Sequence, residues 1–109
     1  MANYHFLLTY SVSPVNKLLS SHRDSSDAMR KKIAQIDENF WTKLADVETT
    51  FIGTMYLTGN SNILKRVQAR KQVLKVFKDL LVEHNSLDKV NVDIALMVNG
   101  LGVHLELQI

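Results

Sequence analysis

Alternating apolar and polar residues predict a β-hairpin over the last twenty residues of the chain. Val90–Val98 and Leu101–Ile109 each alternate, and Asn99-Gly100 lies between them. Asn-Gly in this position is typical of a two-residue type I′ turn, which needs positive φ at both central residues. Such a turn fixes the register and puts ten apolar residues on one face. The expected pairs are Val98–Leu101, Leu96–Val103, Ile94–Leu105, Val92–Leu107 and Val90–Ile109.

The first forty residues contain one strand pattern and one helix pattern. Alternation from Tyr4 to Tyr10 predicts a strand over residues 3–12, which Ser13-Pro14 ends. Residues 13–23 then form a connection. A helix follows, with an N-cap expected at Asp24, Ser25 or Ser26. Its inward stripe has the 4-3-4 spacing of an amphipathic helix and consists of Met29, Ile33, Ile36 and Phe40.

The middle of the chain predicts two strands and a long helix. A short strand is expected at residues 41–44, a turn at Ala45-Asp46 and a long strand at residues 47–58. Gly59-Asn60-Ser61 ends that strand and supplies an N-cap, so a helix is expected over residues 62–83. The residues expected to face inward are Ile63, Val67, Leu74, Phe77 and Leu81, with Val73, Val76 and Leu80 widening the apolar face.

The resulting order is β-α-β-β-α-β with one extra strand at the end. A split β-α-β order with both helices on one face of an antiparallel sheet is the ferredoxin-like arrangement. The sequence therefore predicts an α+β fold, a ferredoxin-like two-layer sandwich extended by a C-terminal strand that forms a hairpin. With 109 residues, the chain is expected to be a single domain over residues 1–109.

Composition excludes several classes of protein. The chain has no cysteine, which rules out a disulfide scaffold, a cysteine-based zinc site and a cysteine nucleophile. No run approaches the ~18 consecutive apolar residues that a membrane helix needs. The first residues lack the basic segment of a signal peptide, so we expect a cytoplasmic protein without a membrane interaction.

Positive charge is concentrated in one helix-sized region. Between Glu48 and Asp79 the sequence has no acidic residue and six basic ones: Lys65, Arg66, Arg70, Lys71, Lys75 and Lys78. Lysine and arginine bind nucleic acids by neutralising phosphates and releasing counterions, so these six are the candidate RNA- or DNA-binding residues. The alternative is an ordinary solvated helix face that pairs with acids elsewhere in the chain.

The terminal strand predicts a homodimer. Its five alternating apolar residues need cover, and an unpaired strand edge favours pairing with another strand. The candidate dimer interface consists of Leu101, Val103, Leu105, Leu107 and Ile109.

Two polar groupings are weaker candidates for chemistry. Asp93 and Glu106 are expected to lie opposite each other on the polar face of the hairpin, with His104 one pair away, a set that could bind a metal or transfer protons. Like charges directly opposite are unusual, yet exposed carboxylates on a solvated face are common. His22 and Arg23 lie in a polar segment that could serve a metal-independent ribonuclease, or could simply be a loop. The four histidines have no metal-ligand spacing, so neither a metal site nor a cofactor is expected, and catalytic residues stay unassigned.

Topology and two short stretches resemble a known family. Met1-Ala2-Asn3-Tyr4 leads directly into a strand, and the stretch from Trp41 to Gly53 ends with Thr50 before Phe51 in the strand that precedes the long helix. These features resemble the small ferredoxin-fold subunit of the CRISPR spacer-integration complex and its relatives, the SinR-like proteins and the GhoS-like antitoxin endoribonucleases. The resemblance implies a homodimer in which the last strand joins the sheet of the partner.

One departure from that family bears on catalysis. Its metal-dependent nucleases carry an aspartate at the end of the first strand, commonly after a tyrosine, whereas here Tyr10 is followed by Ser11-Val12-Ser13. Metal-dependent nuclease activity is therefore disfavoured. We expect a dimeric antitoxin-type or CRISPR-adaptation-like RNA or DNA binder, with endoribonuclease activity left open. The alternative is a protein–protein interaction module, such as a phage or mobile-element protein that blocks a host factor; a small cofactor-free enzyme comes third.

Overall fold

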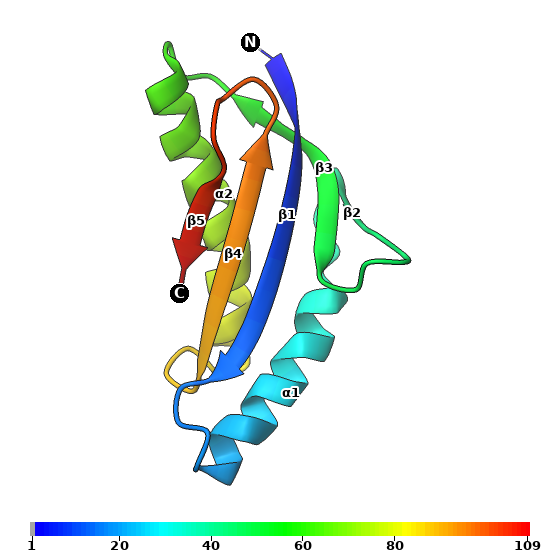
Figure 1. The fold of residues 1–109 in the computed structure, drawn as a ribbon, viewed down its shortest axis with the longest axis vertical. Coiled ribbons are helices and arrows are strands. Elements are labelled where there is room, and N and C mark those ends of the chain that lie inside the picture. Colours follow the sequence, from blue (N-terminus) through cyan, green and yellow to red (C-terminus); the bar gives the residue numbers. More distant parts are fainter. Residues whose placement is uncertain (1) are drawn as a thin grey trace.

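The computed structural model describes residues 2–109 and contains five strands and two helices. Figure 1 shows these elements along the long axis of the molecule. In chain order they are β1 (Ala2–Pro14), α1 (Ser20–Ala34), β2 (Trp41–Lys43), β3 (Thr50–Leu57), α2 (Asn62–Glu83), β4 (Val90–Val98) and β5 (Leu105–Gln108).

The strands form one antiparallel sheet in the order β2-β3-β1-β4-β5. The first strand in the sequence is therefore the central strand of the sheet. Its residue Leu7 lies opposite Ile52 of β3 on one side and opposite Met97 of β4 on the other. The two edges of the sheet are β2, with three residues, and β5, with four.

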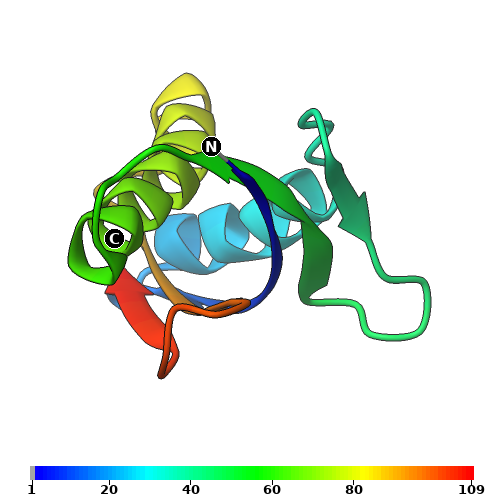
Figure 2. The same ribbon diagram turned by 90° about the horizontal axis from the view of Figure 1, so that it is seen from above.

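Both helices lie on the same face of the sheet, which curves around them (Figure 2). The residues of β4 alternate between buried and more exposed, because successive side chains point to opposite faces of a sheet. The predicted α+β class is thereby confirmed, with five antiparallel strands and two helices arranged compatibly with a two-layer sandwich. The largest fully buried side chains include Leu8, Met29, Ile33, Phe51, Phe77, Leu81 and Leu96.

Aromatic rings fill the core beneath β2 and β3. The ring of Trp41 lies 5.4 Å from that of Phe6, 5.6 Å from Phe51 and 6.3 Å from Phe77, measured between centroids. Tyr10 packs against the last two of these rings. Such edge-to-face and tilted pairs stabilise a core beyond the area that they bury. Trp41 thus ties the short edge strand β2 to the centre of the molecule.

The predicted long helix is confirmed with the same bounds, but the prediction of which residues face inward was partly wrong. Ser61 is its N-cap and accepts a hydrogen bond from the Leu64 amide at 3.2 Å. The fully buried row is Ala69, Val73, Phe77 and Leu81, spaced four residues apart. Ile63 and Val67 precede this row, in the first two turns of the helix, and are exposed.

The first helix begins earlier than predicted. Its N-cap is Leu19, without a side-chain hydrogen bond, and not Asp24, Ser25 or Ser26. The Leu19 amide donates to the Asn16 carbonyl and closes a turn, and the Leu19 carbonyl then accepts from the amides of His22 and Arg23 at the start of the helix. Ser26 is instead buried inside the helix, and its hydroxyl has no hydrogen-bond partner among the described residues. The preceding strand also runs longer than expected, to Pro14, and β3 begins at Thr50 rather than at residue 47.

The C-terminal hairpin forms, but its register differs from the prediction by two residues. Ile94 lies opposite Leu107 and Leu96 opposite Leu105, so residues 99–104 form a longer connection. Gly100 and Gly102 have positive φ, whereas Asn99 does not, so the turn is not type I′. A shift of two keeps the apolar residues of β5 on the core face, but it leaves Val103 in the connection, 75% exposed.

Candidate nucleic-acid interface

All six predicted basic residues lie on α2, but two of them are engaged by the rest of the chain. The side chain of Arg66 reaches the 99–104 connection. Its Nη1 donates to the Leu101 carbonyl at 2.9 Å and also to the Val103 carbonyl. Lys65 lies over the ring of Tyr4, with its Nζ 5.2 Å from the centroid. Arg66 therefore fixes the 99–104 connection, and Lys65 makes a cation–π contact.

Lys75 borders the groove between the two helices and has an acidic neighbour. Its Nζ donates to Asp79 Oδ2 at 2.7 Å, and this hydrogen bond, followed by the charge of Asp79, raises the pKa of Lys75 above its ordinary value. The groove has a volume of about 580 Å³ and lies between the end of α1, the 35–38 segment that follows it and the C-terminal half of α2. Its charged lining residues are Lys32, Lys75, Asp37, Glu38, Asp79 and Glu83. With four carboxylates against two lysines, the groove itself does not favour phosphate.

Three of the six basic residues remain exposed and without an ion pair in the described part of the chain: Arg70, Lys71 and Lys78. Lys71 and Lys78 are seven residues apart, so they lie on one face of the helix, two turns from each other. That face points away from the buried row. The acids of α2, Asp79 and Glu83, line the groove instead. We call the side of α2 that carries Lys71 and Lys78 the basic face; Arg70, seven residues before the buried Phe77, lies nearer the buried row.

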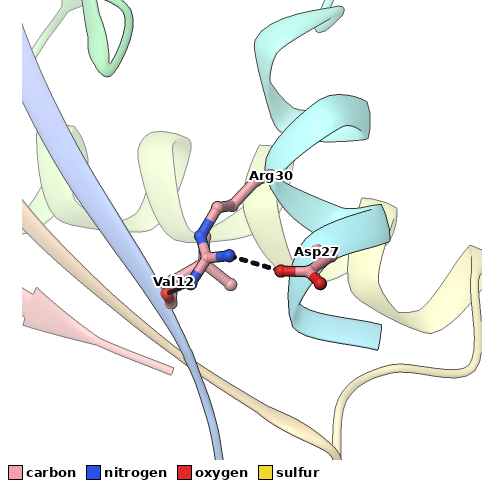
Figure 3. A network of polar contacts seen from close by, with 3 residues as sticks. All are labelled: Val12, Asp27 and Arg30. Carbon is pink, nitrogen blue, oxygen red and sulfur yellow. Dashed lines mark hydrogen bonds and ion pairs between the residues drawn. The ribbon is translucent and has the colours of Figure 1, made fainter. Parts of the chain in front are cut away.

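The basic residues of α1 lie outside the apolar stripe predicted for this helix, and the structure gives them different surroundings. Arg30 donates from Nη1 to Asp27 Oδ1 at 2.6 Å and from Nη2 to the Val12 carbonyl at 3.0 Å, which joins α1 to β1 (Figure 3). Lys32 lies across the groove from Lys75, and Lys31 is exposed. Only the packing of the two helices brings Lys32 near α2, so no pattern in the sequence indicates it.

A second hollow, beside the start of β2, was missed by sequence analysis. We call it the Phe40 pocket; its volume is about 390 Å³. It lies between the 38–41 segment, the end of β3 and one side of α2. The prediction placed Phe40 in the buried stripe of the first helix, which was wrong: that helix ends at Ala34, and Phe40 is 78% exposed. Phe40 fits the 4-3-4 spacing of an amphipathic helix although the helix ends before it. The sequence pattern therefore gave no sign that this residue is exposed.

The five predicted interface residues of the last strand lie in different environments. Leu101, Leu105 and Leu107 are buried within the protomer's own core, Ile109 packs partly against it, and Val103 is exposed. The β5 strand contacts α2, so the helix supplies cover for these side chains. Among residues 2–109, what stays unpaired at this edge is the backbone of β5.

The shifted hairpin register separates the predicted carboxylate pair. Asp93 lies opposite Gln108, and Glu106 lies opposite Ala95, so the two acids are not directly across from each other. His104 Nε2 is 3.8 Å from Glu106 Oε1, on the exposed side of the hairpin. Within residues 2–109 no group of three or more histidine and acidic side chains is placed to hold a metal ion.

His22 and Arg23 hold the connection that precedes α1. The Asn16 amide donates to His22 Nδ1 at 3.1 Å, and Arg23 Nη1 donates to the Lys17 carbonyl at 2.7 Å. These bonds give both residues a structural task at the start of the helix.

Comparisons with protein-family models, with curated proteins and with solved structures give no significant match. The resemblance to the CRISPR-associated and antitoxin families therefore rests on topology and the two short stretches alone. No helix in residues 2–109 is long and apolar enough to cross a membrane.

Proposed function

We propose that this chain is a small cytoplasmic protein that binds nucleic acid through the basic face of α2. The observation that carries the proposal is the segregation of charge on this helix. Arg70, Lys71 and Lys78 are exposed without ion pairs in the described chain, while Asp79 and Glu83 border the groove on the other side. Unpaired cations on a rigid helix can neutralise phosphates without first losing a protein partner.

A ferredoxin-like fold is part of this proposal. Four strands lie in the order β2-β3-β1-β4, and each of two helices connects strands that are not neighbours in the sheet. Both helices cover one face (Figure 2). These features support the split β-α-β arrangement, with β5 as an additional edge strand.

We also propose a homodimer that forms through β5. Support comes from the unpaired backbone of this edge strand rather than from its apolar side chains, which α2 already covers. Light scattering at micromolar concentration should give twice the monomer mass of 12.4 kDa. Proline at Glu106, whose side chain is exposed, would remove a backbone donor from β5, and should shift the mass toward the monomer. A monomeric mass for the unmodified protein would contradict the dimer.

The test of nucleic-acid binding is a charge reversal on the basic face. We expect the Lys71→Glu/Lys78→Glu variant to lose at least about tenfold in affinity for a 20-nucleotide RNA at ~50 mM salt, and its salt slope to fall by about two. Both lysines are exposed, so the fold should survive. The matched control is Lys17→Glu/Lys31→Glu, which changes the net charge equally at exposed positions outside α2 and should bind like the unmodified protein.

Absence of binding by the unmodified protein at ~50 mM salt, where phosphate contacts are strongest, would overturn the proposal. An equal loss in both double variants would show that net charge, not the basic face, is responsible.

The alternative, a protein–protein interaction module, is supported by the other face of the sheet. No helix of the described chain covers this face (Figure 2). A transverse row of apolar side chains crosses it, formed by Ile52, Leu7 and Met97 on three adjacent strands. They are 38%, 44% and 51% exposed, so the row is a partly open apolar patch of the kind that marks protein interfaces. Retained RNA affinity in a Leu7→Ser/Met97→Ser variant would separate this surface from the basic face.

A further inference from the structure

The backbone at Phe40 adopts a conformation that bulky residues rarely adopt. Its φ is 68°, in the left-handed region, where the Cβ atom of a side chain lies too close to the following carbonyl oxygen. Glycine or asparagine is the usual residue there. Because the ring of Phe40 is 78% exposed, burial does not compensate for this strain.

The surrounding structure holds Phe40 in this conformation. Its carbonyl accepts from the Thr54 amide at 3.1 Å, and the next residue, Trp41, is anchored in the aromatic core. Gly53 makes the contact possible, because a Cβ atom there would lie 2.0 Å from the Phe40 carbonyl oxygen. The chain therefore holds an exposed aromatic residue in the lining of the pocket in a strained backbone conformation. Such strain is concentrated at binding sites.

The lining of the Phe40 pocket combines aromatic rings with amide groups. Phe40 and Trp41 are aromatic and Asn39 carries an amide, whereas Asn3 and Tyr56, which pair across β1 and β3, have their side chains on the sheet face of Leu7 and Ile52, opposite α2. An unpaired base presents a π-face and an edge of donors and acceptors, and proteins recognise it by stacking and by hydrogen bonds to that edge. Both kinds of partner are present in this hollow of about 390 Å³.

The charges of the pocket favour a neutral group over a phosphate. Glu38 and Lys75 both line it, so one negative and one positive side chain offset each other. Glu38 adds an acceptor for the N–H groups of a base. Lys75 also connects the pocket to the basic face, since Lys71 and Lys78 lie one turn away from it on either side along α2.

We propose that the Phe40 pocket takes one unstacked base of a single-stranded nucleic acid whose backbone runs along the basic face. This inference rests on the proposed nucleic-acid function and gives it a substrate class: single strands rather than duplexes. A base within a duplex is stacked and paired, so its π-face cannot reach Phe40, while the phosphates of a duplex can still reach the lysines.

The test compares one 20-nucleotide RNA as a single strand and as a duplex, with the unmodified protein and with Phe40→Asn. Asparagine tolerates φ near 68° and removes the ring, so the variant should fold with an unchanged or raised melting temperature. We expect the unmodified protein to prefer the single strand by about tenfold, as one stacked base can provide, and Phe40→Asn to remove that preference while keeping duplex affinity.

The fluorescence of Trp41, the only tryptophan of the chain, provides a second readout. It lines the pocket, so binding of the single strand should change its emission in the unmodified protein and not in Phe40→Asn. The matched control is Leu18→Asn, which removes an 86% exposed apolar side chain away from the pocket and should behave like the unmodified protein.

The outcomes separate the two proposals. Equal affinity for single strand and duplex, unaffected by Phe40→Asn, would overturn the base pocket and leave the basic face intact. Loss of binding to both RNAs only in Lys71→Glu/Lys78→Glu would support the basic face alone. No binding of either RNA by the unmodified protein at ~50 mM salt would overturn both.

Discussion

Three connections of the described chain enter the left-handed region: one does so at Asn85, with φ of 54°, and the other two use contrasting residues. The 99–104 connection uses Gly100 and Gly102, with φ of 81° and 87°, and a Cβ atom at either position would have no neighbour within 4 Å. The 35–40 connection uses Phe40, with φ of 68°, and its carbonyl packs directly against Gly53.

The difference indicates which of the two connections has a role beyond reversing the direction of the chain. At 99–104 glycine removes the strain, and the open connection is tied down from outside by Arg66. At 35–40 the strain is retained on an exposed aromatic residue, although glycine or asparagine would relieve it. Glycine or asparagine at residue 40 would relieve the backbone strain, but the chain has phenylalanine there. We therefore place the base pocket at this position.

The largest loss of stability is expected from a substitution that fills the space occupied by the Phe40 carbonyl. Gly53→Ala should destabilise the fold by about 3 kcal/mol, the upper end for overpacking, because its Cβ would overlap the Phe40 carbonyl. Urea denaturation measures this change. Gly102→Ala is the control, since its Cβ would meet nothing within 4 Å. Equal and small losses for both would show that the two connections do not differ in packing.

A smaller loss is expected from releasing the 99–104 connection. Arg66→Met keeps the apolar stem but removes the two hydrogen bonds to the Leu101 and Val103 carbonyls, which should cost about 2 kcal/mol. Hydrogen exchange of the amides in residues 99–104 should become faster, while that of residues 35–41 stays unchanged. Unaltered exchange at 99–104 would contradict the role of Arg66 as the tie.

The smallest expected changes in the free energy of unfolding come from two substitutions whose effects have opposite signs. Phe40→Asn should raise the free energy of unfolding by about 1 kcal/mol, because asparagine tolerates the left-handed region. Gly102→Ala should lower it by about 1 kcal/mol, because alanine does not. Thermal unfolding of both variants measures the pair. A loss of stability in Phe40→Asn would show that the exposed ring contributes to the fold and that no strain is stored there.

Local patterns predicted the elements well where one signal dominates. The long helix has its expected bounds because Ser61 caps it and its apolar stripe is continuous, and the alternation in β1 and β4 identified the core face correctly. Errors arose where tertiary contacts override local signals. Asn99-Gly100 favours a two-residue turn, but Gly102 also adopts positive φ, and Arg66 binds the carbonyls of the longer connection that results.

The candidate site was less predictable than the fold. The charge run located the six basic residues on α2, but the sequence does not indicate that Arg66 and Lys65 contact their own chain or that Lys75 pairs with Asp79. The Phe40 pocket joins residues from β1, the 38–41 segment, β3 and α2. No periodicity connects segments so distant in sequence, so only the folded chain brings them together.

The central position of β1 sets the order in which the protein can be completed during synthesis. This strand leaves the ribosome before the other four, yet one of its two edges is paired only when β4 emerges, as in the pairing of Phe6 with Val98. Until then a nascent chain that already holds β1, β3 and both helices exposes the unpaired backbone of β1 and the apolar side chains next to it. Addition of β4 therefore completes the pairing of the central strand, and a ribosome that stalls before residue 90 leaves a chain prone to aggregation.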